Sequence, residues 1–342
     1  MGDTHYNMDL PSDLNIYIVS FFPVRDLLTI RLISDPFRQA CKGYDKHIVT
    51  SVPKHSRWRR TFPKARFILP IQINITEEQF NDYIKLENLT IHCPIHEDAF
   101  LKTPRLKQLE LWSRYDKCDM QTLFRPLHQL HTLKIFSHDI TDESLSYLPQ
   151  LKHLGLDHCR RVTSFGIRQL KQLVTLHLHT QPFVTDTAFE GIPLEELYVH
   201  KNDAITDQGI CTLRRLKKLT TCKTPNIHGV GFHSLGQLRS VYLHGVRISS
   251  NYSDFKHVRF LIVNHCILPS SQYDMWTNIR TIQLYNTHIL YPSSLFQLCK
   301  LPYLKHFTIE HCPSMAVHEE SLRTYFGSKL LCKHLNYLTP TY

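Results

Sequence analysis

The sequence predicts an α/β solenoid, a horseshoe in which short parallel strands line the concave face and short helices cover the convex face. Three observations predict it: a recurring L-x-x-L-x-L spacing, an inward-turning residue such as Cys159 after the strand, and an apolar segment that returns to the next strand. We call one strand with its return segment a rung. Rungs 19 to 25 residues apart are expected to begin at Leu86, Leu106, Leu130, Leu151, Leu173, Leu194, Leu219, Leu238, Val258, Ile279 and Leu304.

The composition is that of a folded chain in a reducing compartment. The 342 residues suffice for one long stacked core, and no low-complexity run interrupts them. The ten cysteines are scattered without a C-x-x-C pair, which predicts reduced thiols and a location in the cytoplasm and/or nucleus. No stretch approaches the roughly 20 apolar residues of a membrane span, and no signal peptide is expected. The net charge of +10 fits either an acidic partner or a solvated basic surface.

Residues 8–45 are predicted to form a separate unit of three short helices. Ser12 is a candidate N-cap, Pro23 ends the first helix, and Asp35 with Pro36 begins the third. Three helices of this length cannot shield their many apolar side chains from water. Some of these side chains must therefore face either the repeats or another chain.

The order of residues in this unit resembles the F-box. The matching motifs are Leu10-Pro11, Asp13-Leu14, Phe22-Pro23, Asp26-Leu27-Leu28, Arg31-Leu32-Ile33 and Phe37-Arg38-Gln39-Ala40. The chain departs from the family pattern at Ser34, Pro36 and Phe37, where Cys, a basic residue and Trp are usual. The resemblance implies docking onto the Skp-type adaptor of a cullin-RING ubiquitin ligase. The implied adaptor-binding residues are Leu10, Pro11, Asp13, Leu14, Ile18, Phe21, Phe22, Pro23, Leu27, Leu28, Leu32 and Phe37.

The remaining chain is expected to divide into a linker, the repeats and a cap. The linker, residues 46–61, carries a basic cluster at 54–60 that fits either phosphate binding or a solvated surface with Trp58 packed as a wedge. About 11–12 rungs are expected over residues 62–316. Residues 317–342 are expected to cap the last rung, because solenoids need capped ends. The helical spacing in this cap is carried by Leu322, Phe326 and Leu330.

The return segments repeat a short phrase, I/V-T-D or V-T-S, at residues 140–142, 162–164, 184–186 and 205–207. Its Thr or Asp is expected to cap a convex helix, and the flanking apolar residues to pin that helix to the core. The phrase and the corner residue Cys159 resemble the cysteine-containing leucine-rich repeats typical of F-box proteins. Later rungs are less regular, and the rung assigned to Leu219 has Cys222 and Thr224 where apolar residues are expected.

The side chains between the inward positions are expected to project from the concave face. They are rich in aromatic residues and histidine, which suits a protein-binding surface. The alternative is that these aromatic residues only pack beside one another across the sheet. The candidate residues for binding a protein substrate are Trp112, Phe136, His153, His177, His179, Tyr198, His200, Tyr242, His244, Phe260, Tyr285 and His306.

No catalytic, metal or cofactor site is expected. A zinc site needs ligands that converge from close spacings, whereas the four His-Cys pairs lie on distant rungs, at His92-Cys93, His158-Cys159, His265-Cys266 and His311-Cys312. Three of these cysteines occupy the inward corner, which favours a structural role. The chain has no phosphate-binding Gly-rich loop, no G-x-S-x-G and no H-E-x-x-H motif. Any ubiquitin-transfer chemistry is therefore expected to belong to partner subunits.

Two functions fit these observations. In the first, the chain is the substrate-recognition subunit of a Skp-cullin-F-box ubiquitin ligase, with the adaptor on the N-terminal unit and a protein target on the concave face. In the second, it is a non-catalytic scaffold or inhibitor whose N-terminal helices only cap the solenoid. Nucleic-acid binding is not expected, because the basic residues form no single stripe, and no membrane partner is expected.

Overall fold

The computed structural model describes residues 47–49, 66–69, 87–91, 100–101, 103, 105–112, 118–137, 139–248, 252–268, 273 and 276–333. The chain divides into two units, Met1–Asp139 and Ile140–Tyr342, which are considered one at a time. The expected three-helix unit at 8–45 and all twelve expected adaptor-binding residues lie outside the described residues. Among the described residues, no helix combines the length and apolarity needed to cross a bilayer.

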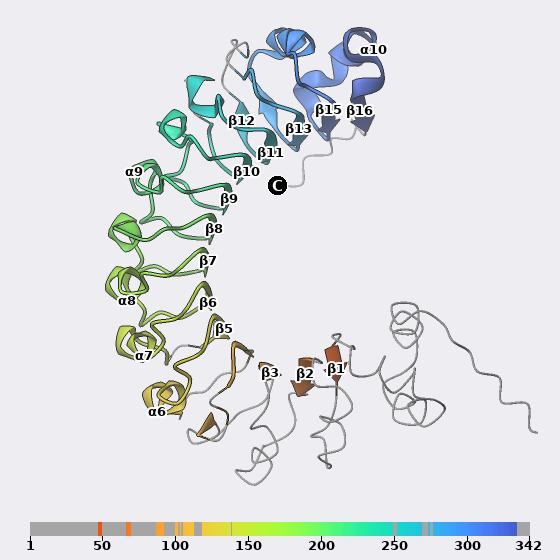
Figure 1. Cartoon of the computed structure of the whole chain (residues 1–342). Coiled ribbons are helices and arrows are strands. Elements are labelled where there is room, and N and C mark those ends of the chain that lie inside the picture. Colours follow the sequence, from red (N-terminus) through yellow and green to blue (C-terminus); the bar gives the residue numbers. More distant parts are fainter. Residues whose placement is uncertain are drawn as a thin grey trace, which may run out of the picture. The chain divides into compact units, whose positions relative to one another are not determined.

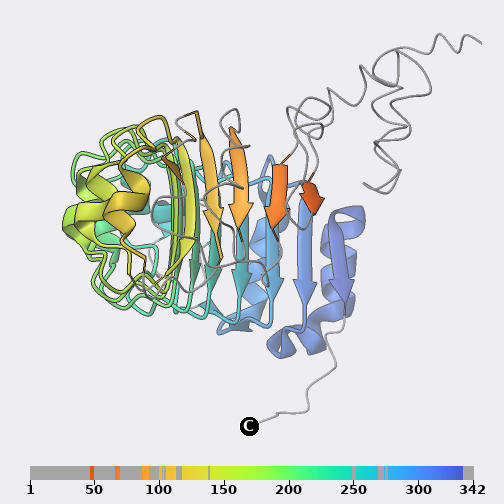
Figure 2. The ribbon, with the colours of Figure 1, turned by 90° about the horizontal axis from the view of Figure 1, so that it is seen from below.

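The first unit contains a parallel sheet in which sequential strands are neighbours. Its strands are β1 (His47–Val49), β2 (Arg66–Leu69), β3 (Asn88–Ile91), β4 (Gln108–Leu111) and β5 (Thr132–Phe136), and helix α6 (Met120–Phe124) precedes β5. Figure 2 shows these strands running side by side in one direction. Strand β1 lies inside the range expected to be a linker, so the sheet begins one strand earlier than the sequence predicted.

The second unit repeats the same rung along one sheet. Its strands are β6 (His153–Asp157), β7 (Thr175–His179), β8 (Glu196–His200), β9 (Lys218–Cys222), β10 (Ser240–His244), β11 (Phe260–Asn264), β13 (Thr281–Tyr285), β15 (His306–Glu310) and β16 (Leu330–Lys333). Each pairs in parallel with the next. A second, two-stranded sheet joins β12 (Ile267–Leu268) to β14 (His288–Ile289). This arrangement confirms the predicted parallel strand stack.

The return segments of the second unit are short helices on the convex side of its sheet (Figure 1). Among the described residues of this unit, α7, α8, α9 and α10 are α-helices, and the other six are 3-10 helices. In chain order they are α7 (Asp142–Ser146), α8 (Ser164–Arg168), η3 (Asp186–Phe189), α9 (Asp207–Cys211), η4 (Phe232–Ser234), η5 (Tyr252–Phe255), η6 (Pro292–Lys300), η7 (Pro313–His318), α10 (Glu319–Phe326) and η8 (Gly327–Lys329).

Each rung from that of β4 to that of β15 buries its first, fourth and sixth residues, counted from its first apolar residue. In the rung of β6 these are Leu151, Leu154 and Leu156, which are all 2% exposed or less. A fully buried leucine contributes roughly 1.5–3 kcal/mol, so the stack is stabilised by many similar contacts rather than by one. The third, fifth and seventh residues of the same rungs alternate with them and face the opposite side of the sheet.

The rung of β9 begins three residues earlier than the sequence predicted. Leu219 pairs with Leu197 and Val241, both of which are fourth residues of their rungs, so Leu216 is the first residue of this rung. The sixth residue is therefore Thr221, and Cys222 moves to the seventh position instead of the core. The prediction that Cys222 replaces an apolar core residue is wrong.

Thr221 places a hydroxyl inside the core. The side chain is fully buried, and its Oγ1 has no hydrogen-bond partner among the described residues. A buried hydroxyl without a partner costs about 1–3 kcal/mol. We therefore expect Thr221→Val, which keeps the shape and removes the hydroxyl, to raise the free energy of unfolding by about 1 kcal/mol in denaturant titration. Thr220→Val, on the partly exposed neighbour, is the control and should change it by less than about 0.5 kcal/mol.

Two backbone features recur at the ends of the main-sheet strands from β6 to β15 in the second unit. The eighth residue of each rung adopts a left-handed conformation, with φ between 48° and 73°, at His158, Thr180, Lys201, Lys223, Gly245, His265, Asn286 and His311. The ninth residue then turns into the core and is buried, at Cys159, Gln181, Asn202, Thr224, Val246, Cys266, Thr287 and Cys312. Six of these corner side chains donate to backbone carbonyls, and Cys266 and Thr287, for example, each do so twice. Val246 has no donor, and the Thr224 hydroxyl has no hydrogen-bond partner among the described residues.

The Thr-Asp phrase links neighbouring rungs as well as capping helices. Thr206 is the N-cap of α9, where its Oγ1 accepts from the backbone N–H of Gln208. The carboxylate of Asp186, one rung earlier, accepts from the backbone N–H of Thr206 at 2.8 Å and from its hydroxyl at 2.7 Å. Asp142 makes the same pair of bonds to Thr163. The threonine caps α7, α8 and α9 as predicted, whereas Thr185 makes no such bond at η3, and the aspartate holds the following rung.

The described chain ends in a helix and one more strand. Leu322 and Phe326 are buried in α10, as their spacing predicted. Leu330 does not continue that helix: it begins β16, which pairs in parallel with β15. The helical interpretation of Leu330 is therefore wrong, and the last described element extends the sheet.

Candidate protein-binding face

The third, fifth and seventh residues of the rungs form one face of each unit's sheet, which we call the inner face. All twelve expected substrate-binding residues lie on it, at the end of β4 or on β5, β6, β7, β8, β10, β11, β13 and β15. None of the twelve is buried. In the first unit, Trp112 directly follows β4 and is 41% exposed, and Phe136 ends β5.

The fifth residues of neighbouring strands form a row in the second unit that includes three aromatic rings. His177 on β7 pairs in register with Tyr198 on β8, and their ring centroids are 5.6 Å apart. Partial burial raises the pKa of Tyr198 above its usual value, so its phenol stays protonated and able to donate a hydrogen bond. Tyr242 continues the row on β10, beyond Thr220 on β9.

The seventh residues form a second row, which is rich in histidine. The rings of His179 and His200 are stacked, with centroids 4.1 Å apart and planes inclined by 14°. Burial lowers the pKa of His200, and the nearby His179 and Lys201 lower it further. Burial also lowers the pKa of His244, and His265 adds to this effect. These two imidazoles therefore favour the neutral form, in which one ring nitrogen donates and the other accepts.

The third residues place further apolar and basic side chains on the inner face. Phe260 is 45% exposed, which is costly for an aromatic residue without a partner. His306 lines a pocket at the last described strands, together with Thr281, Gln283 and Lys329. His153 is also exposed, at the start of β6. The inner face thus combines large rings with adaptable donors and acceptors, the chemistry of a protein-binding surface.

Several charged residues at the ends of the strands were not among the candidates. Asp157 is the seventh residue of its rung, and His158, Lys201, Lys223 and His265 are eighth residues. The L-x-x-L-x-L pattern covers only the first six residues of a rung. It therefore cannot predict that the eighth residue adopts a left-handed conformation and keeps its side chain beside the inner face. The seventh-residue row itself could have been extended to Asp157 from the spacing alone.

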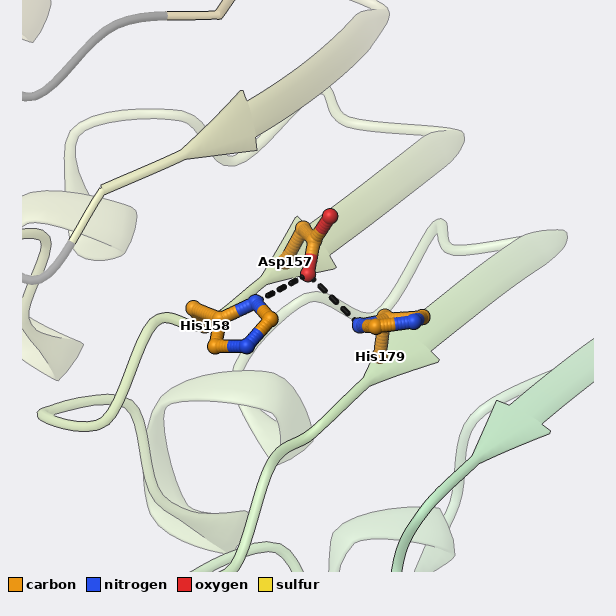
Figure 3. Close-up of side chains that lie close together, drawn as sticks. All are labelled: Asp157, His158 and His179. Atoms are coloured by element: carbon orange, nitrogen blue, oxygen red, sulfur yellow. Dashed lines mark hydrogen bonds and ion pairs between the residues drawn. The ribbon is translucent and has the colours of Figure 1, made fainter. Parts of the chain in front are cut away.

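Asp157 brings two histidines together at this edge. One carboxylate oxygen, Oδ1, lies 2.6 Å from Nδ1 of His158 and 2.7 Å from Nδ1 of His179 (Figure 3). His179 comes from the next strand, where it pairs in register with Asp157. Within the described part of the chain, these three residues form the one group of His, Cys, Asp or Glu side chains close enough to share an ion.

The cysteines behave as structural residues. Cys159, Cys266 and Cys312 are buried corner residues, in agreement with the structural interpretation of three His-Cys pairs; the fourth pair, His92-Cys93, lies outside the described residues. Burial raises the pKa of Cys211, Cys222 and Cys266. A thiol with a raised pKa is a poor nucleophile at neutral pH.

No protein-family model matches the sequence, and no curated protein matches it. Solved structures do match. An internalin from Listeria monocytogenes aligns with a TM-score of 0.61 and 14% identity, over 92% of this chain and 94% of the internalin. A chain of the Drosophila Toll–Spatzle complex aligns with a TM-score of 0.51 and 13% identity, over 85% of this chain and 51% of that one.

The stacked rungs and the exposed inner face define a repeat protein with a protein-interaction fold. Both structural neighbours are leucine-rich-repeat proteins, and this chain has the leucine-rich-repeat fold. At identities of 13% and 14% the likeness concerns the fold alone. The comparisons give no support to the F-box resemblance, which stays a prediction.

Proposed function

We propose that the chain is the substrate-recognition subunit of a Skp-cullin-F-box ubiquitin ligase. Residues 10–40 would hold the Skp-type adaptor, and the inner face would hold a protein target. The chain itself would be non-catalytic and would act in the cytoplasm and/or nucleus. Tethering would raise the effective concentration of target lysines near the ubiquitin-conjugating enzyme, which is sufficient to accelerate transfer without catalytic residues in the receptor.

The observation that carries the proposal is the F-box-like order of residues 10–40 ahead of the repeats. The inner face supports its second half. Phe260, His177 and His306 are exposed on one side of a sheet that is built on closely packed rungs. Rigid presentation of aromatic side chains lowers the entropy lost on binding, so such a face suits a protein target.

Adaptor capture tests the proposal directly. We expect the double variant Leu10→Ala/Pro11→Ala to recover at least about 10-fold less Skp-type adaptor than the wild type in pull-down, because it removes apolar contacts at the expected interface. Phe260→Ala is the matched control: it truncates an exposed ring on the repeats and should leave adaptor recovery unchanged. Equal adaptor recovery by the wild type and the double variant would refute the receptor assignment.

A second candidate function is a scaffold or inhibitor that binds a protein through the inner face alone. The leucine-rich-repeat likeness favours it to the same degree, because the likeness concerns only the repeats. In this case the N-terminal helices serve as a cap, and deletion of residues 1–45 should unfold the first rungs. The receptor function instead predicts that the deleted protein keeps its circular dichroism spectrum and its target binding.

A further inference from the structure

We propose that Asp157, His158 and His179 form a site for a divalent transition-metal ion, with Zn²⁺ as the best fit. The site lies at the ends of strands β6 and β7, on the edge of the inner face (Figure 3). It is independent of the proposed ligase function. One carboxylate oxygen and two imidazole nitrogens all lie within 4.8 Å of one another there.

The ligand chemistry fits zinc. Two histidine nitrogens and one carboxylate oxygen form the protein part of many open zinc sites, in which water or another side chain takes the fourth position. Ligand atoms on one tetrahedral zinc lie about 3.3 Å apart. The present O···N distances are 2.6 and 2.7 Å, so small side-chain rotations would admit the ion. Each imidazole would bind the ion through Nδ1 as the neutral tautomer, which carries its proton on Nε2, so no net proton is lost from a neutral ring.

The backbone that carries the three ligands is held by the sheet. Asp157 and His179 are paired in register, and the backbone N–H of His158 donates to the carbonyl of His179 at 3.1 Å. The left-handed φ of 55° at His158 recurs at the eighth residue of the other rungs, so the turn forms without a metal. The ligands are thus anchored before the ion arrives, which reduces the ordering that binding requires.

The surroundings orient the ligands and leave the ion accessible. The ring of His179 is stacked on His200, and the hydroxyl of Thr180 lies 3.2 Å from Nδ1 of His179. The stacked ring of His200 fixes the ring plane of His179, whereas the Thr180 hydroxyl would have to rotate away from Nδ1 for the ion to bind. The side chains of Asp157, His158 and His179 are 30%, 34% and 33% exposed. An ion can therefore enter the site from solvent.

Metal titration of the tag-free full chain tests the site. After removal of metals with a chelator, we expect one equivalent of Zn²⁺ to bind in calorimetry, and Co²⁺ to give the visible absorption of a site with nitrogen and oxygen ligands. Asp157→Asn and His179→Ala should each weaken Zn²⁺ association at least about 10-fold. Asp157→Asn keeps the size and a hydrogen-bond acceptor, so its circular dichroism spectrum should match that of the wild type.

The double variant His244→Ala/His265→Ala is the matched control. These histidines also lie at the ends of neighbouring strands, with ring centroids 5.2 Å apart, but the paired residue on β11 is Asn264 rather than an aspartate. The control should bind Zn²⁺ as the wild type does. Failure of the wild type to bind one equivalent, or equal affinity in Asp157→Asn and the wild type, would show that the cluster is only a carboxylate bridged by two histidines.

Discussion

Gly209→Ala is expected to lower the free energy of unfolding by about 2 kcal/mol, although alanine is normally the better helix residue. Gly209 lies in α9, against the aspartate that links the preceding rung to this one. An added Cβ would lie 2.5 Å from Cγ and 2.7 Å from Cβ of Asp186. Because Asp186 is held by its two hydrogen bonds to Thr206, it cannot move aside without losing them. Denaturant titration measures the loss.

The chain offers a compensating change for this prediction. In the rung of α8, two before that of α9, Ser164 takes the place of the aspartate. The next rung carries Ala188 where the rungs of α8 and α9 have Gly166 and Gly209. Ser164 still accepts from the backbone N–H of Thr185 at 2.8 Å. We therefore expect Gly209→Ala to be neutral or stabilising in an Asp186→Ser background. An equal loss in both backgrounds would show that the contact with Asp186 is not its cause.

The strand positions were predictable because each rung repeats the same burial pattern. The one misplaced rung shows the limit of that signal. Leu216 and Leu219 are three residues apart, and Thr221 is polar, so the L-x-x-L-x-L pattern is incomplete in both frames, although the spacing of 22 residues from Leu194 favours Leu216. Pairing of Leu219 with Leu197 and Val241 decides between them, since a shifted frame would break the ladder on both sides.

The inner-face candidates followed from strand alternation, whereas the Asp157 cluster did not. The sequence grouped His158 with its neighbour Cys159, because zinc ligands are commonly sought at short spacings. In the structure these two side chains separate: Cys159 turns into the core, and His158 remains beside Asp157. His179 joins them through the register of β6 with β7. Such contacts depend both on the turn at His158 and on the register of β6 with β7, and a short sequence motif predicts neither of them.

Asn202→Ala is expected to have the largest effect on stability, a loss of about 3–5 kcal/mol, because it leaves several buried backbone groups unpaired. Asn202 is the corner residue of its rung and is 1% exposed. Its Nδ2 donates to the carbonyls of Gln181 and Val184 at 2.6 and 2.9 Å. Its Oδ1 accepts from the backbone N–H groups of Ala204 and Ile205 at 2.9 and 2.8 Å. Every hydrogen-bonding group of the amide is thus used.

Asn226→Ala is the matched control for Asn202→Ala. Asn226 is exposed, and its Nδ2 also donates to a carbonyl of the preceding rung, that of Asp203, at 2.6 Å. Water replaces this bond when the side chain is removed, so the expected loss is below about 0.5 kcal/mol. Comparable losses from the two variants would mean that the corner amide does not bridge the rungs. If only Asn202→Ala lowers the free energy of unfolding strongly, the hydrogen bonds of this buried corner residue to the preceding rung hold the two rungs at their spacing.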